Sequence, residues 1–492
     1  MPTPKLVALA VTAVIALSAA IAGMASAATG IAPLGSRHGV CVDRPLRLAF
    51  DQPPQLGTTG TIQVHRADGT IADSIDLADP ASNERTIGDA VSDTGEPHLF
   101  AYHPVMVTGN AAAIYLHHRL DYGRTYYVTV DPGVFGGFPG IQDPGAWRFT
   151  TRAAPPSPRA RHLTVDARGA GDFCTVQGAI DAVPLGNRHR VTVDVRPGRY
   201  TEIVYVRPDR PYITVRGAGR DRTVIEYANN DVLNGDTHLR TAPDGPNVCP
   251  LRKLPTPDLH NCWRAMFGVD APDFTLENIT LHNTTPFGGS QAEAFRGNND
   301  RIALRHVTLR SFQDTLRLQG LGYVDHSYIE GDVDFIWGTG TIYVRDSEIR
   351  SLHAGYVTQI RNDDAHFGAV FVRTRLTRAP DLADANVYLG RIETLRFPFS
   401  QVVFIDTAMD AHIRPAGWLL TPNDCAQAPN LRFWEYHSTD LAGRPVDTSS
   451  RPACSQQLTD AAAAQWRDPR FVLGGWAVTK QHGTDVTSSR GS

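Results

Sequence analysis

The chain has 492 residues, and its hydrophobic fraction of 42% and aromatic fraction of 8% are ordinary for globular proteins, which argues against long disordered tails. The formal net charge of -4 argues against a nucleic-acid partner, because neutralising phosphates requires a basic surface. The length exceeds what one hydrophobic core usually supports, so two domains are expected.

Residues 1–27 have the pattern of a secretory signal peptide. Lys5 precedes the apolar run LVALAVTAVIALSAAIAGM, and Ala25-Ser26-Ala27 provides a small-residue cleavage site. The apolar run is also long enough to span a bilayer, so an uncleaved membrane anchor is the competing interpretation. We expect a secreted protein, extracellular or periplasmic, without stable membrane insertion once the signal is cleaved.

All six cysteines lie after this segment. The close pairs Cys249/Cys262 and Cys425/Cys454 are candidate disulfides for an oxidising compartment, although spacing alone leaves the connectivity open. Metal binding by these cysteines is disfavoured because no CxxC spacing occurs. The sequence therefore predicts disulfide bonds and no metal site.

Residues 30–151 are expected to form a small Ig-like β-sandwich. Segments such as TIQVHRADGTIADSIDL, AAIYLHHRL and TYYVTVDPG alternate apolar and polar residues between Gly, Pro and Asp turns. This region contains no recognisable catalytic constellation. The Pro-rich residues 152–161 follow it as a linker.

A short repeat appears within residues 162–478, and residues 479–492 are expected to form a C-terminal tail. The repeated segments carry apolar or small residues at relative positions 0, +3 and +5, and their first members are 28, 20 and 20 residues apart. Repeats of this length with almost no helical periodicity predict a solenoid of β-coils, since a single coil could not bury its apolar face alone. A β-sandwich with many hairpins is the alternative, but Asn-Gly hairpin turns are scarce. The aligned sets are Leu276/Ile279/Leu281, Leu304/Val307/Leu309, Val324/Ser327/Ile329 and Val344/Ser347/Ile349.

Two aspartates occupy equivalent places in successive repeats. Asp314 and Asp334 each lie ten residues after the first residue of a repeat. Neighbouring strands are about 4.7–4.9 Å apart, so the two carboxyl groups should project within roughly that range. Like charges so close disfavour joint ionisation, which would leave one general acid and one nucleophile or base. Two unrelated turn aspartates are the structural alternative.

Three polar side chains are expected beside the aspartates. Gln313 directly precedes Asp314, and Gln291 lies about one coil earlier, so neutral amide donors could hold a developing oxyanion. Taken alone, each glutamine also fits an ordinary surface amide. Arg391, in YLGRIE, is a candidate to pair with one aspartate and keep it ionised.

Over residues 162–478 the ordered motifs resemble those of the pectin methylesterases, carbohydrate esterases built on a right-handed parallel β-helix. The motifs are GDFCTVQGAIDAVP at 171–184, GRYTE at 198–202, QAEAFR at 291–296, FQDTL at 312–316, YIEGDVDFIWG at 328–338, YLGR at 388–391 and PAGW at 415–418. The resemblance implies an all-β fold and a divergent bacterial member of the family. It also implies a monomer that demethylesterifies pectin to pectate and methanol with no metal or organic cofactor.

Position by position, the resemblance implies that Asp334 is the nucleophile and Asp314 the general acid and later the general base. It implies that Gln313 and Gln291 stabilise the oxyanion, while Arg391 orients Asp334. Substrate-binding roles are implied for Thr284, Gln291, Arg391 and Trp337.

The chain departs from the family pattern near the predicted cleft. Where LGRPW is usual, Ile392 and Glu393 replace a proline and a substrate-stacking tryptophan, which weakens the expected contact with a sugar ring. Glu293 stands in QAEAFR where an apolar residue is commoner, and residues 229–263 are expected to form a long inserted loop. These changes leave the ester open. A divergent bacterial branch of this fold is described as acyl thioester hydrolases, so an acyl thioester or another ester is the second hypothesis.

Other functions are disfavoured. Close carboxylates also suit a glycoside hydrolase, but the NTD and GHG signatures of polygalacturonases are absent. A serine esterase is disfavoured because no GxSxG is present. A non-catalytic glycan-binding surface protein would not need Asp314, Asp334, Gln313 and Arg391 together.

Overall fold

The computed structural model describes residues 32–478, apart from positions 34, 36 and 84 and the stretches 92–96 and 232–263. The predicted signal peptide, the tail, most of the inserted loop and the Cys249/Cys262 pair lie outside the described residues. Among the residues that are described, no helix is both long enough and apolar enough to cross a bilayer.

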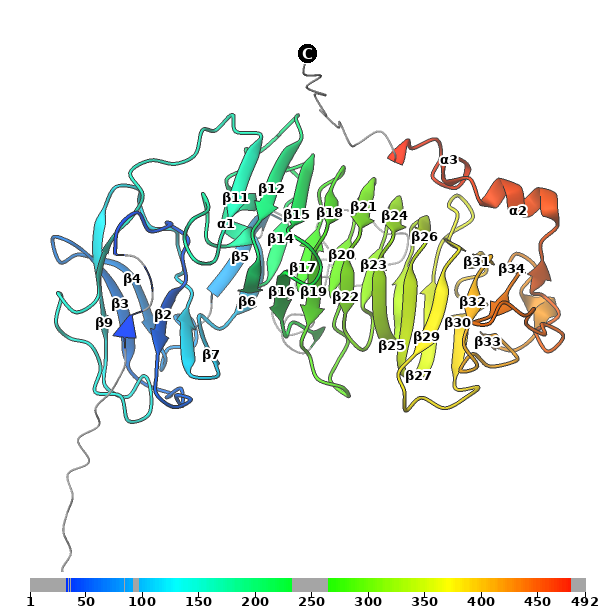
Figure 1. The fold of residues 1–492 in the computed structure, drawn as a ribbon, viewed down its shortest axis with the longest axis horizontal. Helices are drawn as coiled ribbons and strands as arrows, with labels where there is room; N and C mark the ends of the chain where they lie inside the picture. Colours follow the sequence, from blue (N-terminus) through cyan, green and yellow to red (C-terminus); the bar gives the residue numbers. More distant parts are fainter. Residues whose placement is uncertain are drawn as a thin grey trace, which may run out of the picture.

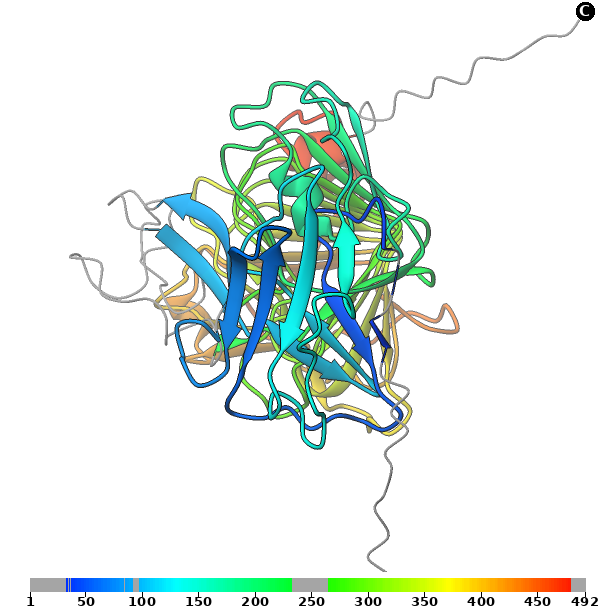
Figure 2. The same ribbon diagram turned by 90° about the vertical axis from the view of Figure 1, so that its left-hand side faces the viewer.

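The first part of the chain forms two antiparallel four-stranded sheets (Figures 1 and 2). The strands are β1 (Ala32–Pro33), β2 (Leu46–Ala49), β3 (Thr61–Arg66), β4 (Ile71–Asp76), β7 (Val105–Thr108), β8 (Ala111–Ile114), β9 (Thr125–Val130) and β10 (Arg148–Thr150). One sheet has the order β1-β2-β8-β7 and the other β10-β9-β3-β4. Apolar residues from both sheets, such as Leu48, Val64 and Val128, share one core, as the alternating pattern predicts.

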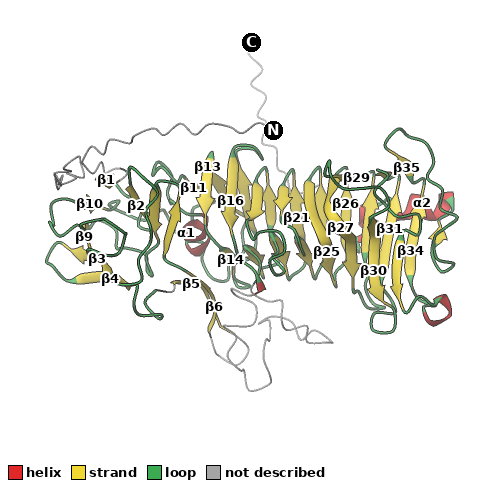
Figure 3. Cartoon of the chain, turned by 90° about the horizontal axis from the view of Figure 1, so that it is seen from below, coloured by secondary structure: helices red, strands yellow, loops and turns green. Residues whose placement is uncertain are grey.

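A hairpin extends from this region toward the rest of the chain. Its strands are β5 (Arg85–Val91) and β6 (Pro97–Tyr102), which pair antiparallel. Figure 3 shows the hairpin beside the strand β14 (Val204–Val206), which β5 contacts. Ile87 of the hairpin joins the hydrophobic core of the second part of the chain.

The second part is a parallel β-helix. Along one side runs a parallel sheet with the order β11-β12-β15-β18-β21-β24-β26-β28-β31-β34-β36. Its strands are β11 (His162–Val165), β12 (Val191–Val195), β15 (Ile213–Gly217), β18 (Thr275–Glu277), β21 (Ile302–Arg305), β24 (Gly322–Asp325), β26 (Ile342–Arg345), β28 (Ala369–Val372), β31 (Gln401–Ile405), β34 (Arg432–Tyr436) and β36 (Gln456–Gln457).

Two further rows of parallel strands complete each coil, joined into one sheet because the strands β25 and β27 run through both rows. The first row is β13 (Gly198–Thr201), β16 (Thr223–Tyr227), β19 (Thr280–Asn283), β22 (Thr308–Arg310), β25 (Tyr328–Gly338), β27 (Glu348–Ile360), β29 (Arg375–Arg378), β32 (Ala408–Met409) and β35 (Thr439–Asp440). The second row is β14, β17 (Phe267–Val269), β20 (Phe295–Gly297), β23 (Leu316–Leu318), the far ends of β25 and β27, then β30 (Val387–Glu393) and β33 (Trp418–Thr421).

The residues of the predicted sequence repeat pair with one another in the register of these parallel sheets. Leu276 pairs with Leu304, Leu304 with Val324, and Val324 with Val344, so the first positions of the four repeats stack directly. The residues at position +5 stack in the same way, from Leu281 to Ile349. From β21 to β24 and from β24 to β26, each coil takes 20 residues. The prediction of a β-solenoid is confirmed.

A sharp turn with a left-handed backbone residue recurs between the eleven-stranded sheet and the first of the two further rows. Asn278, His306, His326 and Asp346 occupy this position on successive coils, with φ between 47° and 56°. Asn, Asp and His tolerate this region better than most side chains, because short polar groups can bond locally. The N–H of Ser327 donates to Ser347 Oγ at 3.0 Å, which ties one turn to the next.

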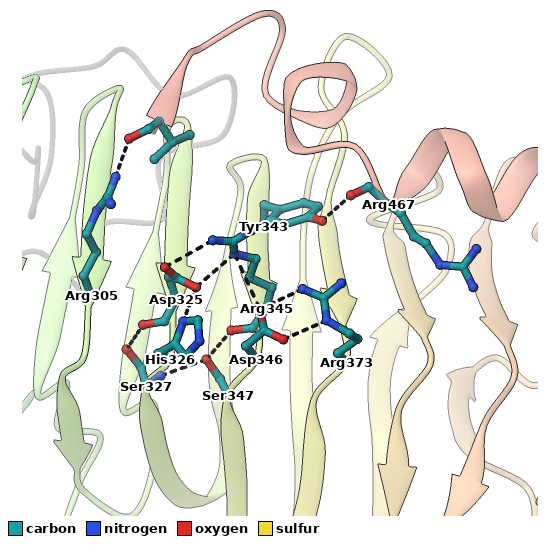
Figure 4. Close-up of polar contacts among 11 residues, drawn as sticks. Arg305, Asp325, His326, Ser327, Tyr343, Arg345, Asp346, Ser347, Arg373 and Arg467 are labelled. Atoms are coloured by element: carbon teal, nitrogen blue, oxygen red, sulfur yellow. Dashed lines mark hydrogen bonds and ion pairs between the residues drawn. The ribbon is translucent and has the colours of Figure 1, made fainter. Parts of the chain in front are cut away.

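Short helices follow the last coils and cover the outside of the eleven-stranded sheet. The helices α2 (Asp460–Trp466) and α3 (Pro469–Val472) pack on Tyr323, Tyr343 and neighbouring apolar residues. Figure 4 shows Tyr343 Oη donating to the carbonyl of Arg467 at 2.5 Å. Beside it Arg373 bonds both carboxylate oxygens of Asp346, at 2.8 and 2.7 Å.

Two disulfides hold the described part of the chain. The predicted Cys425–Cys454 bond is present, and Cys41–Cys174 joins the N-terminal sheets to the first coil across 133 residues. Asp43 strengthens this junction, because the N–H and hydroxyl of Thr175 donate to its Oδ2 at 2.8 and 2.7 Å. The N-terminal sheets are therefore fastened to the end of the β-helix.

Another buried carboxylate lies at the same junction. Glu202 accepts hydrogen bonds from the N–H groups of Val176 and Gln177, at 2.9 and 3.0 Å. These residues begin the short helix α1 (Val176–Asp181), which packs against β11, β12 and β14. Burial raises the pKa of Glu202 to about 7, despite the two amide donors, which lower it.

Candidate active site

Asp314 and Asp334 lie side by side on successive coils. Asp334 is on β25, and Asp314 is in the turn between β22 and β23. The two coils pair in register, Leu316 with Ile336, and the N–H of Asp314 donates to the carbonyl of Val333 at 3.1 Å. The twenty-residue interval thus brings two carboxyl groups together, as the repeat predicts.

Both aspartates are buried on a constrained backbone. Asp314 is 6% exposed with φ 65°, and Asp334 is 4% exposed with φ 51°. Left-handed conformations outside glycine are held in place by surrounding structure, and they concentrate at functional sites. Here the parallel ladders before and after each turn fix the two carboxyl groups.

Arg391 holds the carboxylate of Asp334. Its Nε lies 2.9 Å from Oδ1 and 3.1 Å from Oδ2, and its Nη2 also bonds Oδ2. The guanidinium reaches Asp334 from β30 and lies 4.5 Å above the ring of Tyr356 on the strand between. Burial raises the pKa of Asp334, and the bonds from Arg391 oppose that rise by stabilising the ionised form.

Asp314 has a different electrostatic environment. Burial raises its pKa to about 8, Arg264 opposes the rise, and the carboxylates of Glu293 and Asp334 add to it. Asp314 is therefore mostly protonated at neutral pH, whereas Asp334 is paired with the guanidinium of Arg391. The pair has the asymmetry that an acid and a nucleophile need.

Arg264 completes the site, although sequence reasoning missed it. It is 2% exposed, its Nε donates to Glu293 Oε1 at 2.9 Å, and its Nη2 bonds Asp314 Oδ2. Its Nη1 lies 3.5 Å from Asp231. The available signal was Glu293 itself, because a carboxylate in the apolar segment QAEAFR requires a buried cation.

The two glutamines lie next to each other across the coils. Gln313 directly precedes Asp314, and its carbonyl accepts from the N–H of Ala292 at 3.2 Å, next to Gln291. Both side chains are half-buried. The structure therefore places the two glutamines on adjacent coils, with Gln313 next to Asp314.

Trp337 lies deeper than a surface binding residue. It is 2% exposed, and the guanidinium carbons of Arg264, Arg317 and Arg361 lie 5.2, 4.3 and 5.2 Å from its ring centroid. Cation–π contacts of this kind stabilise buried arginines. Its buried position makes Trp337 a support beneath the arginines and leaves its ring little surface for a ligand.

The other predicted cleft residues are spread around the site. Thr284 is exposed and donates its N–H to the carbonyl of Tyr227 at 3.0 Å. Ile392 is buried in the core, while Glu393 is exposed and lies 3.7 Å from Arg396. The substitution that replaces the expected aromatic residue therefore places a carboxylate at the surface, two residues from Arg391.

Two groups of possible metal ligands occur among the described residues, and each already has partners. Cys41 and Cys174, near Asp43, are joined as a disulfide. Asp325 and Asp346, near His326, are bonded to arginines, as Figure 4 shows. Neither group borders the aspartate pair.

Comparisons with known proteins show which sequences this chain is similar to. The family profile described as Pectinesterase matches residues 162–245 and 257–475. Pectinesterase 31 of Arabidopsis thaliana is 33% identical over 318 residues, which cover 63% of this chain and 92% of that protein.

Solved structures have the same fold. Pectin methylesterase from carrot matches with a TM-score of 0.53 and 25% identity, covering 64% of this chain and 94% of that one. A pectin methylesterase in complex with a hexasaccharide matches with a TM-score of 0.51 and 24% identity, covering 64% of this chain and 98% of the other.

Proposed function

This chain belongs to the pectinesterase family, and from that premise we propose that it removes methyl groups from pectin through an aspartyl nucleophile, yielding pectate and methanol. The observation that carries the proposal is the pairing on adjacent coils of Asp314, whose pKa burial raises to about 8, with Asp334, which Arg391 binds. Such a pair can supply the two proton states that ester hydrolysis needs.

In the first step, an oxygen of the Asp334 carboxylate attacks the ester carbonyl carbon. The carbonyl electron pair moves onto oxygen, where the amide groups of Gln313 and Gln291 donate hydrogen bonds to the developing oxyanion. As the tetrahedral intermediate collapses, the bond to the methoxy oxygen breaks and Asp314 protonates that oxygen. Methanol leaves, and the uronate remains joined to Asp334 as an acyl-enzyme.

The second step reverses the role of Asp314. Its carboxylate, now ionised, takes a proton from a water molecule while the water oxygen attacks the acyl carbonyl carbon. Collapse of this second intermediate breaks the bond to Asp334 and frees the uronic acid of pectate. Asp334 is again a carboxylate held by Arg391, and Asp314 again carries its proton.

The remaining features of the chain fit an exported enzyme. We propose that residues 1–27 direct secretion, that residues 30–151 form an accessory Ig-like domain and that residues 152–161 link it to a catalytic domain of residues 162–478. We further propose that the secreted protein acts as a monomer on pectin, with no metal or organic cofactor. The proposed substrate contacts are those of Thr284, Gln291 and Arg391, while the predicted binding role of Trp337 is replaced by a supporting role beneath the arginines, because its ring is buried.

Glu393 favours a second candidate reaction. Its exposed carboxylate would repel a polyuronate, so hydrolysis of an acyl thioester or another ester at the same aspartates is the alternative. The test compares methanol release from highly methylated pectin with thiol release from acyl-CoA by the purified mature chain. Methanol release with no thiol release supports the pectinesterase reaction, and the reverse result supports the alternative.

A further inference from the structure

A pocket of about 180 Å³ lies directly beside the aspartate pair. Gln313, Val333 and Ala292 line it, and these residues are the immediate chain neighbours of Asp314, Asp334 and Gln291 respectively. Any group bound in this pocket therefore lies next to the place where the ester would react.

One wall of the pocket is aromatic. Phe287 is 61% exposed, and its ring lies 3.8 Å from the ring of His353, inclined by 29°. Phe312, which also lines the pocket, contacts both, with centroid distances of 5.5 Å to Phe287 and 5.6 Å to His353. Phe287 is thus a large aromatic side chain that is exposed to solvent and packs against two other rings. Such a surface is suited to ligand contact.

The wall is held in position from two sides. The N–H of Gly289 donates to the carbonyl of Pro286 at 2.9 Å, and Gly288 has φ 77°, so Phe287 stands at the corner of a tight turn. On the other side His353 Nδ1 lies 3.3 Å from Oδ2 of the buried Asp332. A preformed surface lowers the entropic cost of binding.

The pocket also has polar lining residues. Thr285, Ser290, Ser311 and Gln313 line it together with Phe287. A pyranose ring has an apolar face of C–H groups and a rim of hydroxyls. It therefore matches a pocket that combines an aromatic ring with hydrogen-bonding side chains.

We propose that this pocket is a subsite for one uronate ring of the polysaccharide, next to the ring whose ester reacts, with Phe287 and His353 as its stacking platform. The inference rests on the proposed function. It assigns to the loop of residues 285–290 the aromatic contact that Glu393 cannot make.

The test measures binding of oligogalacturonate by calorimetry and methanol release from pectin, for the wild type and for Phe287→Ala, Phe287→Trp and His353→Ala. Loss of one stacking contact should weaken the Kd and raise the KM about two- to twelvefold, which corresponds to about 0.5–1.5 kcal/mol at 1.4 kcal/mol per tenfold change. The kcat should stay near the wild-type value, and Phe287→Trp, which keeps an aromatic ring, should bind about as tightly as the wild type. Leu185→Ala, at another exposed apolar residue, is the matched control and should change neither value.

Unchanged Kd and KM in folded Phe287→Ala and His353→Ala, beside an active wild type, would overturn the subsite while leaving the proposed function intact. A fall in kcat without a rise in KM would also overturn it. If the wild type neither binds oligogalacturonate nor releases methanol, the proposed function fails together with the subsite.

Discussion

Replacing Arg264 by methionine should both destabilise the protein and alter its pH profile. Arg264 is buried with Glu293 at 2.9 Å, and Asp314 is mostly protonated near neutral pH, so the charge pair that is lost is Arg264–Glu293. Unit charges about 3–4 Å apart interact by about 4–6 kcal/mol at an effective dielectric constant of about 20. Removing one partner of a buried pair typically costs about 3–5 kcal/mol, which we expect here. The double variant Arg264→Met/Glu293→Val should recover most of that loss, because it removes both members of the fully buried pair.

Arg264 and Glu293 shift the pKa of Asp314 in opposite directions. Burial raises that pKa to about 8, the charge of Arg264 lowers it, and the charge of Glu293 raises it. The first step needs Asp314 protonated, so Asp314 sets the alkaline limb of kcat/KM. Arg264→Met should move that limb to higher pH, and Glu293→Gln should move it to lower pH.

The assay is methanol release from pectin between pH 5 and pH 10, with circular dichroism to select folded variants and urea unfolding to measure stability. Opposite displacements of the alkaline limb are the expected result. Displacements in the same direction, or an unmoved limb in both folded variants, would refute the assignment of Asp314 as the acid.

Two further predictions concern the junction between the N-terminal sheets and the β-helix. Burial raises the pKa of Glu202 from 4.5 to about 7, so its contribution to stability is fully present below about pH 4.5 and is lost as the pH rises through about 7. The stability lost over this range is about 3 kcal/mol. Glu202→Gln should abolish this pH-dependent loss when urea unfolding is compared at pH 5 and pH 8. An equal pH dependence of stability in the wild type and the variant would contradict the reasoning. Removing Cys41–Cys174, which spans 133 residues, should cost about 1.3 kcal/mol more than removing Cys425–Cys454, which spans 29, by the loop-entropy relation. Equal unfolding midpoints for the two double alanine variants would count against that relation here.

The sequence predicted the coil and the aspartate pair because both depend on a local period. The stacking of Leu304 on Val324 and the neighbouring positions of Asp314 and Asp334 follow from one twenty-residue interval. The sequence made Arg391 a candidate partner for one of the aspartates, but the choice of Asp334 came from the family resemblance, since 57 residues separate the two.

Other features depend on contacts between distant segments, which no local pattern contains. Arg264 meets Asp314 across 50 residues, and Cys41 meets Cys174 across 133. The ring of His353 reaches Phe287 from three coils further along the chain. Each of these contacts becomes visible once the coils are stacked, because stacking turns a separation along the chain into a distance of a few strands.

The most direct test of the aspartyl site measures methanol release from pectin by Asp334→Asn, Asp314→Asn and the control Asp346→Asn. Asp346 is matched to Asp334, because it also has a left-handed backbone and bonds an arginine through both oxygens, but it belongs to the turn drawn in Figure 4. We expect release by Asp334→Asn to fall to background, release by Asp314→Asn to fall about 10²–10⁴-fold, and release by Asp346→Asn to stay close to wild type. Folded Asp334→Asn that releases methanol as fast as Asp346→Asn would contradict the account.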